Sequence, residues 1–168
     1  MLYELLPLLR GWMYQYVEKT STLTLGREAT IDTVEAKGWL LTAAAFLSGS
    51  RDAKYVRIHV EIDGPDRAYP IDFSLQGLKE FGVNQPINYG AFLLRYSDEE
   101  KKYAGAITPS KPMPIAKKLE VKLIPPQAPI EETTALPISY HCAYALAKVI
   151  DEEEFKRSLR ELLKGEDK

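Results

Sequence analysis

The chain has 168 residues, of which 45% are hydrophobic and 27% charged, and its formal net charge is −2. This composition is typical of a globular domain with a sizeable core and excludes a disordered chain. The 22 basic residues are balanced by 24 acidic ones. The basic excess of nucleic-acid binders is therefore missing, and we expect no nucleic-acid partner.

Membrane insertion and secretion are not expected either. No stretch contains the roughly 18 consecutive apolar residues that cross a bilayer. Glu4, Pro7 and Arg10 interrupt the apolar start of the chain, which is unlike a signal peptide. The single cysteine, Cys142, allows no intrachain disulfide. Few Asn and Cys beside many Glu and Lys are compatible with a thermophilic source.

Residues 1–19 are expected to form an N-terminal arm or a short helix. Trp12, Tyr14 and Tyr16 alternate along the sequence, and this spacing favours an extended second half. Aromatic side chains offer a large contact area with few rotatable bonds. They can therefore fold back onto the core of their own chain or contact a neighbouring subunit, and the sequence leaves both alternatives open.

The next expected strands differ in whether one or both of their faces should be buried. Segments 20–25 and 29–35 are rich in β-branched residues and flank a turn at Gly26-Arg27. Segment 38–48 is apolar on both alternating faces, which predicts a central strand covered on both sides. Segment 55–62 alternates strictly between apolar and polar residues, so one face should contact the core and the other water or a partner.

A third strand is expected after the tight turn at Asp63-Gly64, followed by a short helix. Apolar residues at helical spacing place this helix at 75–81. Ser74 is a suitable N-cap and Gly82 a suitable stop. The helix should therefore cover one corner of the sheets.

The second half of the chain predicts more strands, joined by proline-rich loops. Segments 91–96 and 102–108 flank a charged turn and predict a hairpin, and segment 118–124 alternates well. Residues 138–150 fit either a strand or a helix, and we favour the strand because their tyrosines alternate. Asp151 then caps an amphipathic helix with three glutamates in its first turn.

These elements predict an all-β fold, an antiparallel β-sandwich or jelly roll with a short corner helix and a C-terminal amphipathic helix. The expected organisation is an arm or short helix at 1–19, a sandwich at 20–150, and a C-terminal helix and tail at 151–168. The sequence lacks the alternation of strands and helices that would predict a parallel sheet, and no internal repeat is visible.

Residues that could carry chemistry are few. His59 lies on the polar face of its strand, which predicts a surface residue. His141 and Cys142 are adjacent in a predicted strand, so they should point to opposite faces and form no catalytic pair. Two His and one Cys do not make a zinc site, and the sequence has no phosphate-binding loop or serine nucleophile elbow. We therefore predict neither an enzyme nor a cofactor.

An alternative function is a carbohydrate-binding module assisted by calcium. Asp63 and Asp66 bracket a tight turn and could bind calcium, although Asp-Gly-Pro-Asp is also ordinary turn chemistry. Tyrosines at predicted strand ends and loops could stack on sugar rings or contact another subunit. These tyrosines are Tyr55, Tyr69, Tyr89, Tyr96 and Tyr103.

One region resembles a pattern found in virion proteins of tailed phages and archaeal viruses. The pattern comprises Gly38-Trp39-Leu40-Leu41, the turn SGSRDAK and the strand YVRIHVEIDG, and segment 118–124 is similar to its companion strand. The resemblance implies a β-sandwich that assembles into a capsid, decoration or tail structure through terminal arms and long loops. It implies no catalytic residue.

We therefore predict a non-enzymatic structural protein that assembles with itself and with other structural proteins of a virion, with the cytoplasm as the alternative location. The terminal segments should make the contacts, because their apolar side chains need a surface to cover them. The predicted interface residues are Trp12, Tyr14, Tyr16, Phe155, Leu159, Leu162 and Leu163.

Overall fold

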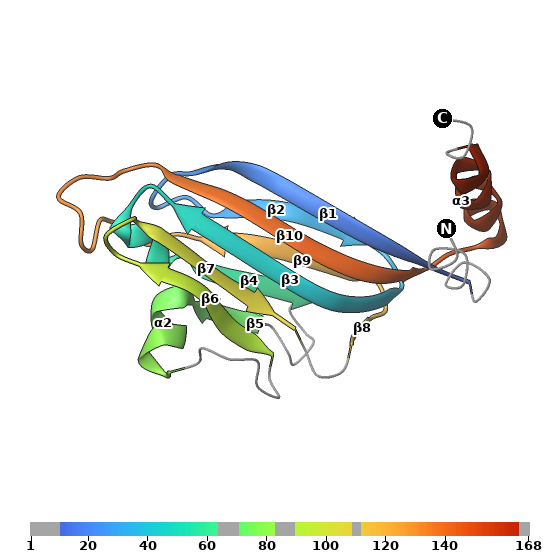
Figure 1. Ribbon diagram of the computed structural model, residues 1–168, viewed down its shortest axis with the longest axis horizontal. Helices are drawn as coiled ribbons and strands as arrows, with labels where there is room; N and C mark the ends of the chain where they lie inside the picture. Colours follow the sequence, from blue (N-terminus) through green and yellow to red (C-terminus); the bar gives the residue numbers. More distant parts are fainter. Residues whose placement is uncertain (1–10, 64–70, 83–89, 109–111, 165–168) are drawn as a thin grey trace.

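The computed structural model describes residues 11–63, 71–82, 90–108 and 112–164. They form two antiparallel β-sheets, with a short helix near one end of the molecule and a longer helix at the other (Figure 1). The predicted all-β sandwich is confirmed. No helix in these ranges is long and apolar enough to cross a membrane.

Sheet A contains the longest strands. Its order is β1-β10-β3-β7-β6, and β8 pairs with the start of β3. The strands are β1 Trp12–Leu23, β3 Gly38–Ser48, β6 Ala91–Ser97, β7 Lys102–Ile107, β8 Met113–Ile115 and β10 Ile138–Val149. The central position of β3 agrees with its two apolar faces. The ambiguous segment near the C-terminus is a strand, as favoured from its tyrosines.

Sheet B is smaller, with the order β2-β9-β4-β5. Its strands are β2 Ala29–Glu35, β4 Arg57–Ile62, β5 Ile71–Ser74 and β9 Lys118–Ile124. Strict alternation in β4 and β9 buries the aliphatic side chains and leaves the charged ones on the opposite face. The buried faces of the two sheets form one hydrophobic core.

Two buried tyrosines connect this core to polar groups at its margins. The side chains of Tyr103 and Tyr144 are almost fully buried. The Tyr144 hydroxyl donates a hydrogen bond to Asp32 at 2.5 Å, and the Tyr103 hydroxyl donates to Asp98 at 2.8 Å. Each ring therefore contributes apolar area to the core while its polar end is satisfied.

Three helical segments complete the described chain: the 3-10 helix η1 Arg51–Tyr55, α2 Leu75–Glu80 and α3 Glu152–Lys164. The predicted caps are confirmed, because the Ser74 side chain accepts the Gly77 N–H at 3.0 Å and Asp151 accepts the Glu154 N–H at 2.8 Å. The α3 helix lies beyond the end of β1 and β10 (Figure 1).

Three features differ from the sequence-based expectation. Strand β1 begins at Trp12, so residues 12–19 belong to sheet A and do not form a separate arm. The polar turn after β3 is the helix η1, which carries the chain from sheet A to sheet B. Strand β8 forms within a proline-rich segment. Pro114 is tolerated there because β8 pairs with β3 alone in the described sheet.

The packing of α2 on sheet A gives a testable prediction at Gly105 of β7. A Cβ atom at this position would lie 2.5 Å from Cδ2 of Leu75, which is fully buried. We expect Gly105→Ala to lower the free energy of unfolding by about 1–3 kcal/mol, because a packed core cannot absorb the extra methyl group. Chemical denaturation measures the change. The cost should shrink in a Leu75→Ala background, and an equal cost in both backgrounds would contradict the clash.

Candidate functional site

The outer face of sheet A has a floor of small side chains. In the strand register, Ala143 of β10, Ala44 of β3 and Ala106 of β7 lie side by side. We call this surface the alanine face. Its alanines are Ala44, Ala104, Ala106, Ala143, Ala145 and Ala147. Because methyl groups project little above the backbone, the middle of the face is flat.

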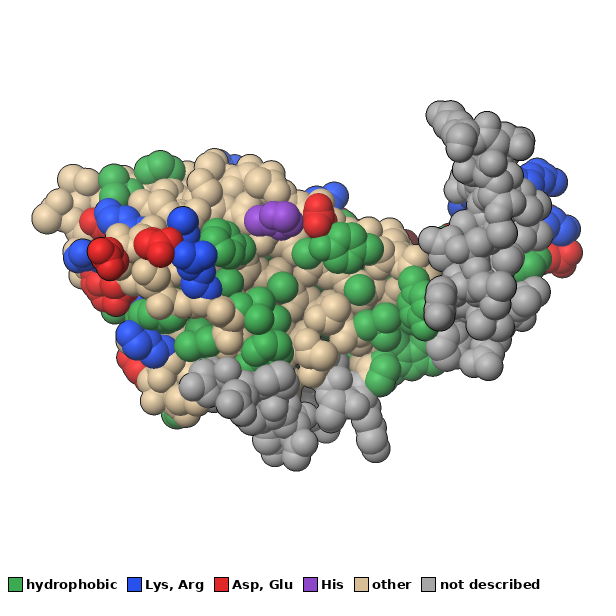
Figure 2. All heavy atoms as spheres, in the orientation of Figure 1, with side chains coloured by type: hydrophobic (Ala, Val, Ile, Leu, Met, Phe, Trp, Pro, Cys, Tyr) green, Lys and Arg blue, Asp and Glu red, His purple; other side chains and the backbone are tan. Residues whose placement is uncertain are grey.

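Large apolar side chains border this floor and remain exposed. Tyr14 and Tyr16 of β1 are 58% and 65% exposed, Phe46 of β3 is 36% exposed, and Val149 at the end of β10 is 44% exposed. Seven large hydrophobic side chains are exposed in the described ranges, and these four lie on the alanine face by register. Figure 2 shows apolar side chains along the middle of this face.

Charged side chains are sparse over the central strands of the alanine face. Strands β10, β3 and β7 place one there, Lys102, opposite Ser48 at the end of the sheet. Glu18 lies on the edge strand β1, 3.7 Å from His141. In Figure 2 most of the charged side chains in view gather at the ends of the molecule. An exposed apolar patch of this kind indicates contact with another molecule.

The outer face of sheet B is charged instead. Lys118 and Lys122 lie 2.7 and 2.6 Å from the carboxylate of Glu120 between them. His59 Nδ1 lies 3.3 Å from the Asp72 carboxylate on the neighbouring strand. His59 is thus on the polar face, as predicted, although its side chain is only 18% exposed. Such a lattice of opposite charges suits a face in contact with water.

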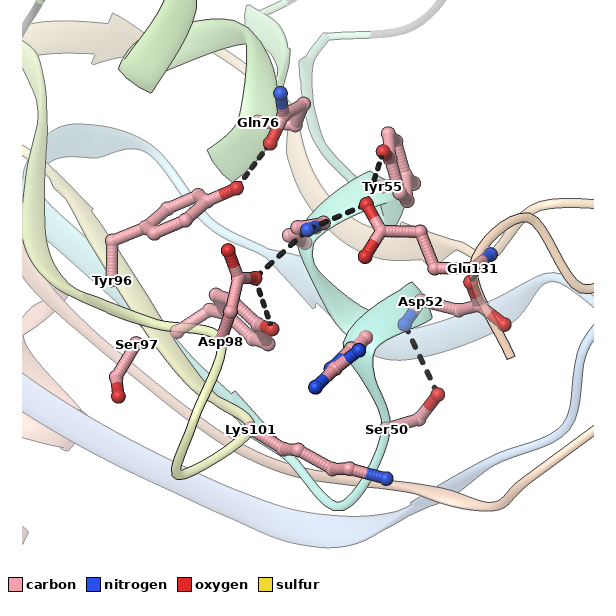
Figure 3. Close-up of polar contacts among 12 residues, drawn as sticks. Ser50, Asp52, Tyr55, Gln76, Tyr96, Ser97, Asp98, Lys101 and Glu131 are labelled. Atoms are coloured by element: carbon pink, nitrogen blue, oxygen red, sulfur yellow. Dashed lines mark hydrogen bonds and ion pairs between the residues drawn. The ribbon is translucent and has the colours of Figure 1, made fainter.

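A group of polar side chains surrounds helix η1 (Figure 3). Lys54 is 4% exposed, and its Nζ lies 2.8 Å from Asp98 Oδ1 and 2.6 Å from Glu131 Oε1. Tyr55 donates a hydrogen bond to Glu131, and Tyr103 donates to Asp98, each at 2.8 Å. We call these five residues the Lys54 cluster.

The Lys54 cluster fixes its own protonation states. Burial alone would lower the pKa of Lys54, but its hydrogen bonds to Asp98 and Glu131 outweigh burial and hold the pKa above its ordinary value. Lys54 in turn holds the pKa of both carboxyl groups below their usual range. A lysine held protonated is neither a base nor a nucleophile. The cluster is therefore a structural ion network.

A buried carboxylate beside this cluster fixes the long loop between β9 and β10. Asp52 is fully buried, and its Oδ1 accepts the backbone N–H groups of Ile130 at 3.1 Å and Glu131 at 2.7 Å. Glu132 accepts the backbone N–H of Arg51 at 3.0 Å. The loop predicted from its prolines is thus attached to η1, and a loop held in this way is not free to wrap around a partner.

The calcium hypothesis does not fit the site of Asp63. Its carboxylate accepts the backbone N–H groups of Ala116, Lys117 and Lys118 at 2.5–3.0 Å. These bonds fix the turn before β9. Asp66 lies outside the described residues. Within the ranges that the structure describes, no group of three or more His, Cys, Asp or Glu could hold a metal ion.

The predicted sugar platform is not assembled from the described tyrosines. Tyr103 is buried, and Tyr96 is half-buried in edge contact with it, at 5.1 Å between ring centroids. Tyr55 is half-buried and bonded to Glu131 in the Lys54 cluster. Tyr69 and Tyr89 lie outside the described residues.

His141 and Cys142 form no catalytic pair, as the strand prediction required. The His141 side chain is 48% exposed on the alanine face, whereas Cys142 is 4% exposed on the core side of β10. Burial raises the pKa of the Cys142 thiol to about 12. The thiolate that a nucleophile needs is therefore not formed near neutral pH.

The predicted interface residues are only partly covered by the structure. Tyr14 and Tyr16 lie exposed on the alanine face, and Phe155 is half-buried in the first turn of α3. The side chains of Trp12, Leu159, Leu162 and Leu163 lie outside the described part of the chain, so their interface role stays a prediction.

Sequence reasoning missed the alanines as a surface. Ala44 was attributed to a strand covered on both sides, because alanine suits a buried position as well as an exposed one. A signal was present in the alternation itself. In β10 the larger residues Cys142, Tyr144 and Leu146 all fall on one face, and the alanines fall on the other.

No family model and no curated protein matches this chain. Two solved structures are similar, both described as periplasmic inhibitors of g-type lysozyme. PliG of Salmonella Typhimurium has a TM-score of 0.36 and 14% identity, covering 77% of this chain and 86% of that chain. PliG of Aeromonas hydrophila has a TM-score of 0.37 and 10% identity, covering 79% and 86%. Structural similarity at this level is no evidence of a shared binding site.

The prediction of a virion structural protein is wrong by this comparison, and so are the capsid, decoration and tail roles. Both similar structures are periplasmic inhibitors, and neither is a virion protein. The same finding corrects the predicted virion or cytoplasmic location. Both proteins are named as inhibitors of another protein and not as enzymes. With no matching family model, the motif-level resemblance to virion proteins remains untested.

The Lys54 cluster predicts a large effect of removing its cation. Lys54→Met should lower the free energy of unfolding by about 2 kcal/mol, because Asp98 and Glu131 lose the charge that offsets their partial desolvation. Urea denaturation measures the loss. The matched control is Lys102→Met, which breaks an exposed pair with Glu100 and should cost less than about 1 kcal/mol. Equal losses would show that Lys54 is not structural.

The lowered pKa of Glu131 predicts a pH dependence. A carboxyl group whose pKa is lower in the folded state stabilises the fold above its ordinary value, near 4.5, and this stabilisation is lost as the pH falls. Glu131→Gln should therefore destabilise the protein near neutral pH, and the difference from wild type should shrink below about pH 4. Urea denaturation across a pH series measures it. A constant difference at every pH would contradict the ion pair.

Proposed function

We propose that the chain is a protein-binding domain without catalytic activity, and that it binds its partner with the alanine face. One observation carries the proposal. Exposed large apolar side chains gather on this face around an almost uncharged floor, whereas charges cover the outer face of sheet B. Exposing such a patch to water is unfavourable, and a partner surface would cover it.

The chemistry of the face favours a protein partner of apolar, uncharged surface. Protein interfaces are enriched in tyrosine and phenylalanine and depleted of charge at their centre. The alanine face has both features, because Tyr14, Tyr16 and Phe46 border a floor that is almost uncharged. A sugar would need hydrogen-bonding groups beside the aromatic rings. The methyl groups of Ala143, Ala145 and neighbouring alanines offer none, and the hydrogen-bonding groups of this face, such as Glu18 and His141, lie beside the floor.

The reactive groups in the described ranges are engaged elsewhere, which supports binding over catalysis. The Cys142 thiol is buried with a raised pKa. Lys54 is held protonated between two carboxylates. His141 lies on the alanine face, 3.7 Å from the carboxylate of Glu18. A second copy of the chain is one candidate partner, and a loss of solution mass in the Ala145→Arg variant would distinguish it from an unrelated protein.

The proposal predicts the effect of a charge at the centre of the face. Ala145→Arg should abolish capture of the partner, because burying an unpaired guanidinium is costly, while the thermal stability of the domain stays near wild type. The measurement compares proteins captured from cells that make this chain by wild type, Ala145→Arg and a matched control. The control is Thr33→Arg, an exposed position opposite Glu120 on sheet B.

A protein retained by wild type and by Thr33→Arg but lost with Ala145→Arg supports the alanine face as the binding surface. Equal capture by all three variants contradicts it. A glycan array run with the same three proteins tests the alternative ligand. Glycan binding that is lost only with Ala145→Arg would overturn the choice of a protein partner.

A further inference from the structure

The strands that end the two sheets, β1 and β6 in sheet A and β2 and β5 in sheet B, give four edges that differ in how they are protected. Strand β6 has a register shift between Leu93 and Arg95, and β2 has one between Thr30 and Asp32. Strand β5 is only four residues long. Bulges and short strands are the usual means by which proteins prevent an edge from pairing with another chain. Three of the four edges therefore carry such protection.

The fourth edge, β1, has neither a bulge nor a short strand, and its protection is limited to the charges of Glu18 and Lys19. It is 12 residues long and pairs with β10 from Trp12 to Leu23 without a register shift. Its sequence, WMYQYVEKTSTL, contains no proline or glycine. In the described part of the chain, β10 is the only strand that pairs with it. A long, regular edge of this kind is a template for a further strand.

The charges of β1, which within the chain lie beside the Tyr16 hydroxyl and Asp32, are compatible with a second copy of β1 as that strand. Its only charged residues are the neighbours Glu18 and Lys19, which lie near the middle of the strand. In an antiparallel pair centred on Val17, Glu18 lies opposite Tyr16 of the second copy, and Lys19 lies opposite Gln15. The Glu18 carboxylate then lies opposite the Tyr16 hydroxyl, and the Lys19 ammonium lies opposite the Gln15 amide. No like charges are directly opposite each other.

Neighbouring registers are less suitable. Centring the pair on Glu18 places two carboxylates opposite each other, which is unfavourable. Centring it on Tyr16 leaves Ser21, Thr22 and Leu23 without a partner. The register centred on Val17 pairs residues 12 to 22 of one copy with residues 22 to 12 of the other, almost the whole strand.

We propose that two copies of the chain join through β1 in this antiparallel register, with a twofold axis at Val17. The two copies of sheet A then form one continuous sheet, and the N–H and C=O groups of β1 that point away from β10 make about ten backbone hydrogen bonds. This goes beyond the proposed function, because the dimer uses a sheet edge and leaves the floor of the alanine face open.

Crosslinking tests the register. In the proposed dimer, Tyr14 lies opposite Thr20 of the second copy, whereas the two copies of Tyr14 lie about 20 Å apart, six residues along the strands. The variant Tyr14→Cys/Thr20→Cys should therefore be converted to a covalent dimer by a short bis-maleimide. The single variants Tyr14→Cys and Thr20→Cys should stay monomeric on a denaturing gel. The native Cys142 is buried, and wild type controls for it.

Introducing a charge of either sign at Gln15 tests the affinity of the two copies for each other. Gln15→Lys places a lysine opposite Lys19 of the second copy. It should raise the dissociation constant of the dimer about tenfold, because the twofold axis makes this repulsion occur twice. Gln15→Glu, at the same position, should strengthen it. Sedimentation equilibrium across a concentration series measures both, and wild type should reach twice the chain mass of 19.0 kDa.

Two results would overturn the proposal: wild type that stays at 19.0 kDa at every concentration, or covalent dimers from the Tyr14→Cys single variant. Ala145→Arg separates this inference from the proposed function, since it should leave the dimer mass unchanged while it abolishes partner capture. A monomer that still captures its partner would refute the dimer alone. A dimer with no captured partner would refute the binding face alone.

Discussion

The small side chains on both faces of β3 determine much of the remaining structure. Toward the core, Ala43 lies between Tyr144 and Ile107, so that a small residue separates two large ones, and Ala45 lies between Cys142 and Gly105. Toward the outside, the alanine of β3 continues the alanines of β10 and β7. One strand thus makes room for the buried ring of Tyr144 and also flattens the surface.

The buried tyrosines transmit this arrangement to the margins of the sandwich. Tyr144 reaches Asp32 on β2 of the other sheet, and Tyr103 reaches Asp98, which also binds Lys54. Lys54 holds Glu131, and Asp52 holds the backbone of the same loop. Core packing, the ion network and the path of the β9–β10 loop are consequently connected through a few hydrogen bonds whose partners are far apart in sequence.

Most of the strands could be predicted from the sequence because their signals are local. Alternation in β4 and β9, the apolar faces of β3, and the caps Ser74 and Asp151 each depend on a few neighbouring residues. The hairpin of β6 and β7 follows from a charged turn between two apolar segments.

The missed features depend on contacts between distant segments. Lys54, buried with Asp98 and Glu131, has nothing in its neighbouring sequence that indicates burial. The alanine face requires the register of three strands from opposite ends of the chain. Asp63 was correctly placed at a turn, but its acceptance of three backbone N–H groups near residue 117 could not be read from the turn sequence.

The neighbours β1 and β10 are the first and last strands that the structure describes, and this pairing has a consequence for synthesis on the ribosome. Contacts of such long sequence separation close a large loop, and their entropic cost delays them. Until the C-terminal strand has emerged, β1 has no neighbour within sheet A, and β3 is open on the side where β10 belongs. Completion of sheet A must therefore await β10, and until then the nascent chain carries two open strand edges that require protection from other nascent chains.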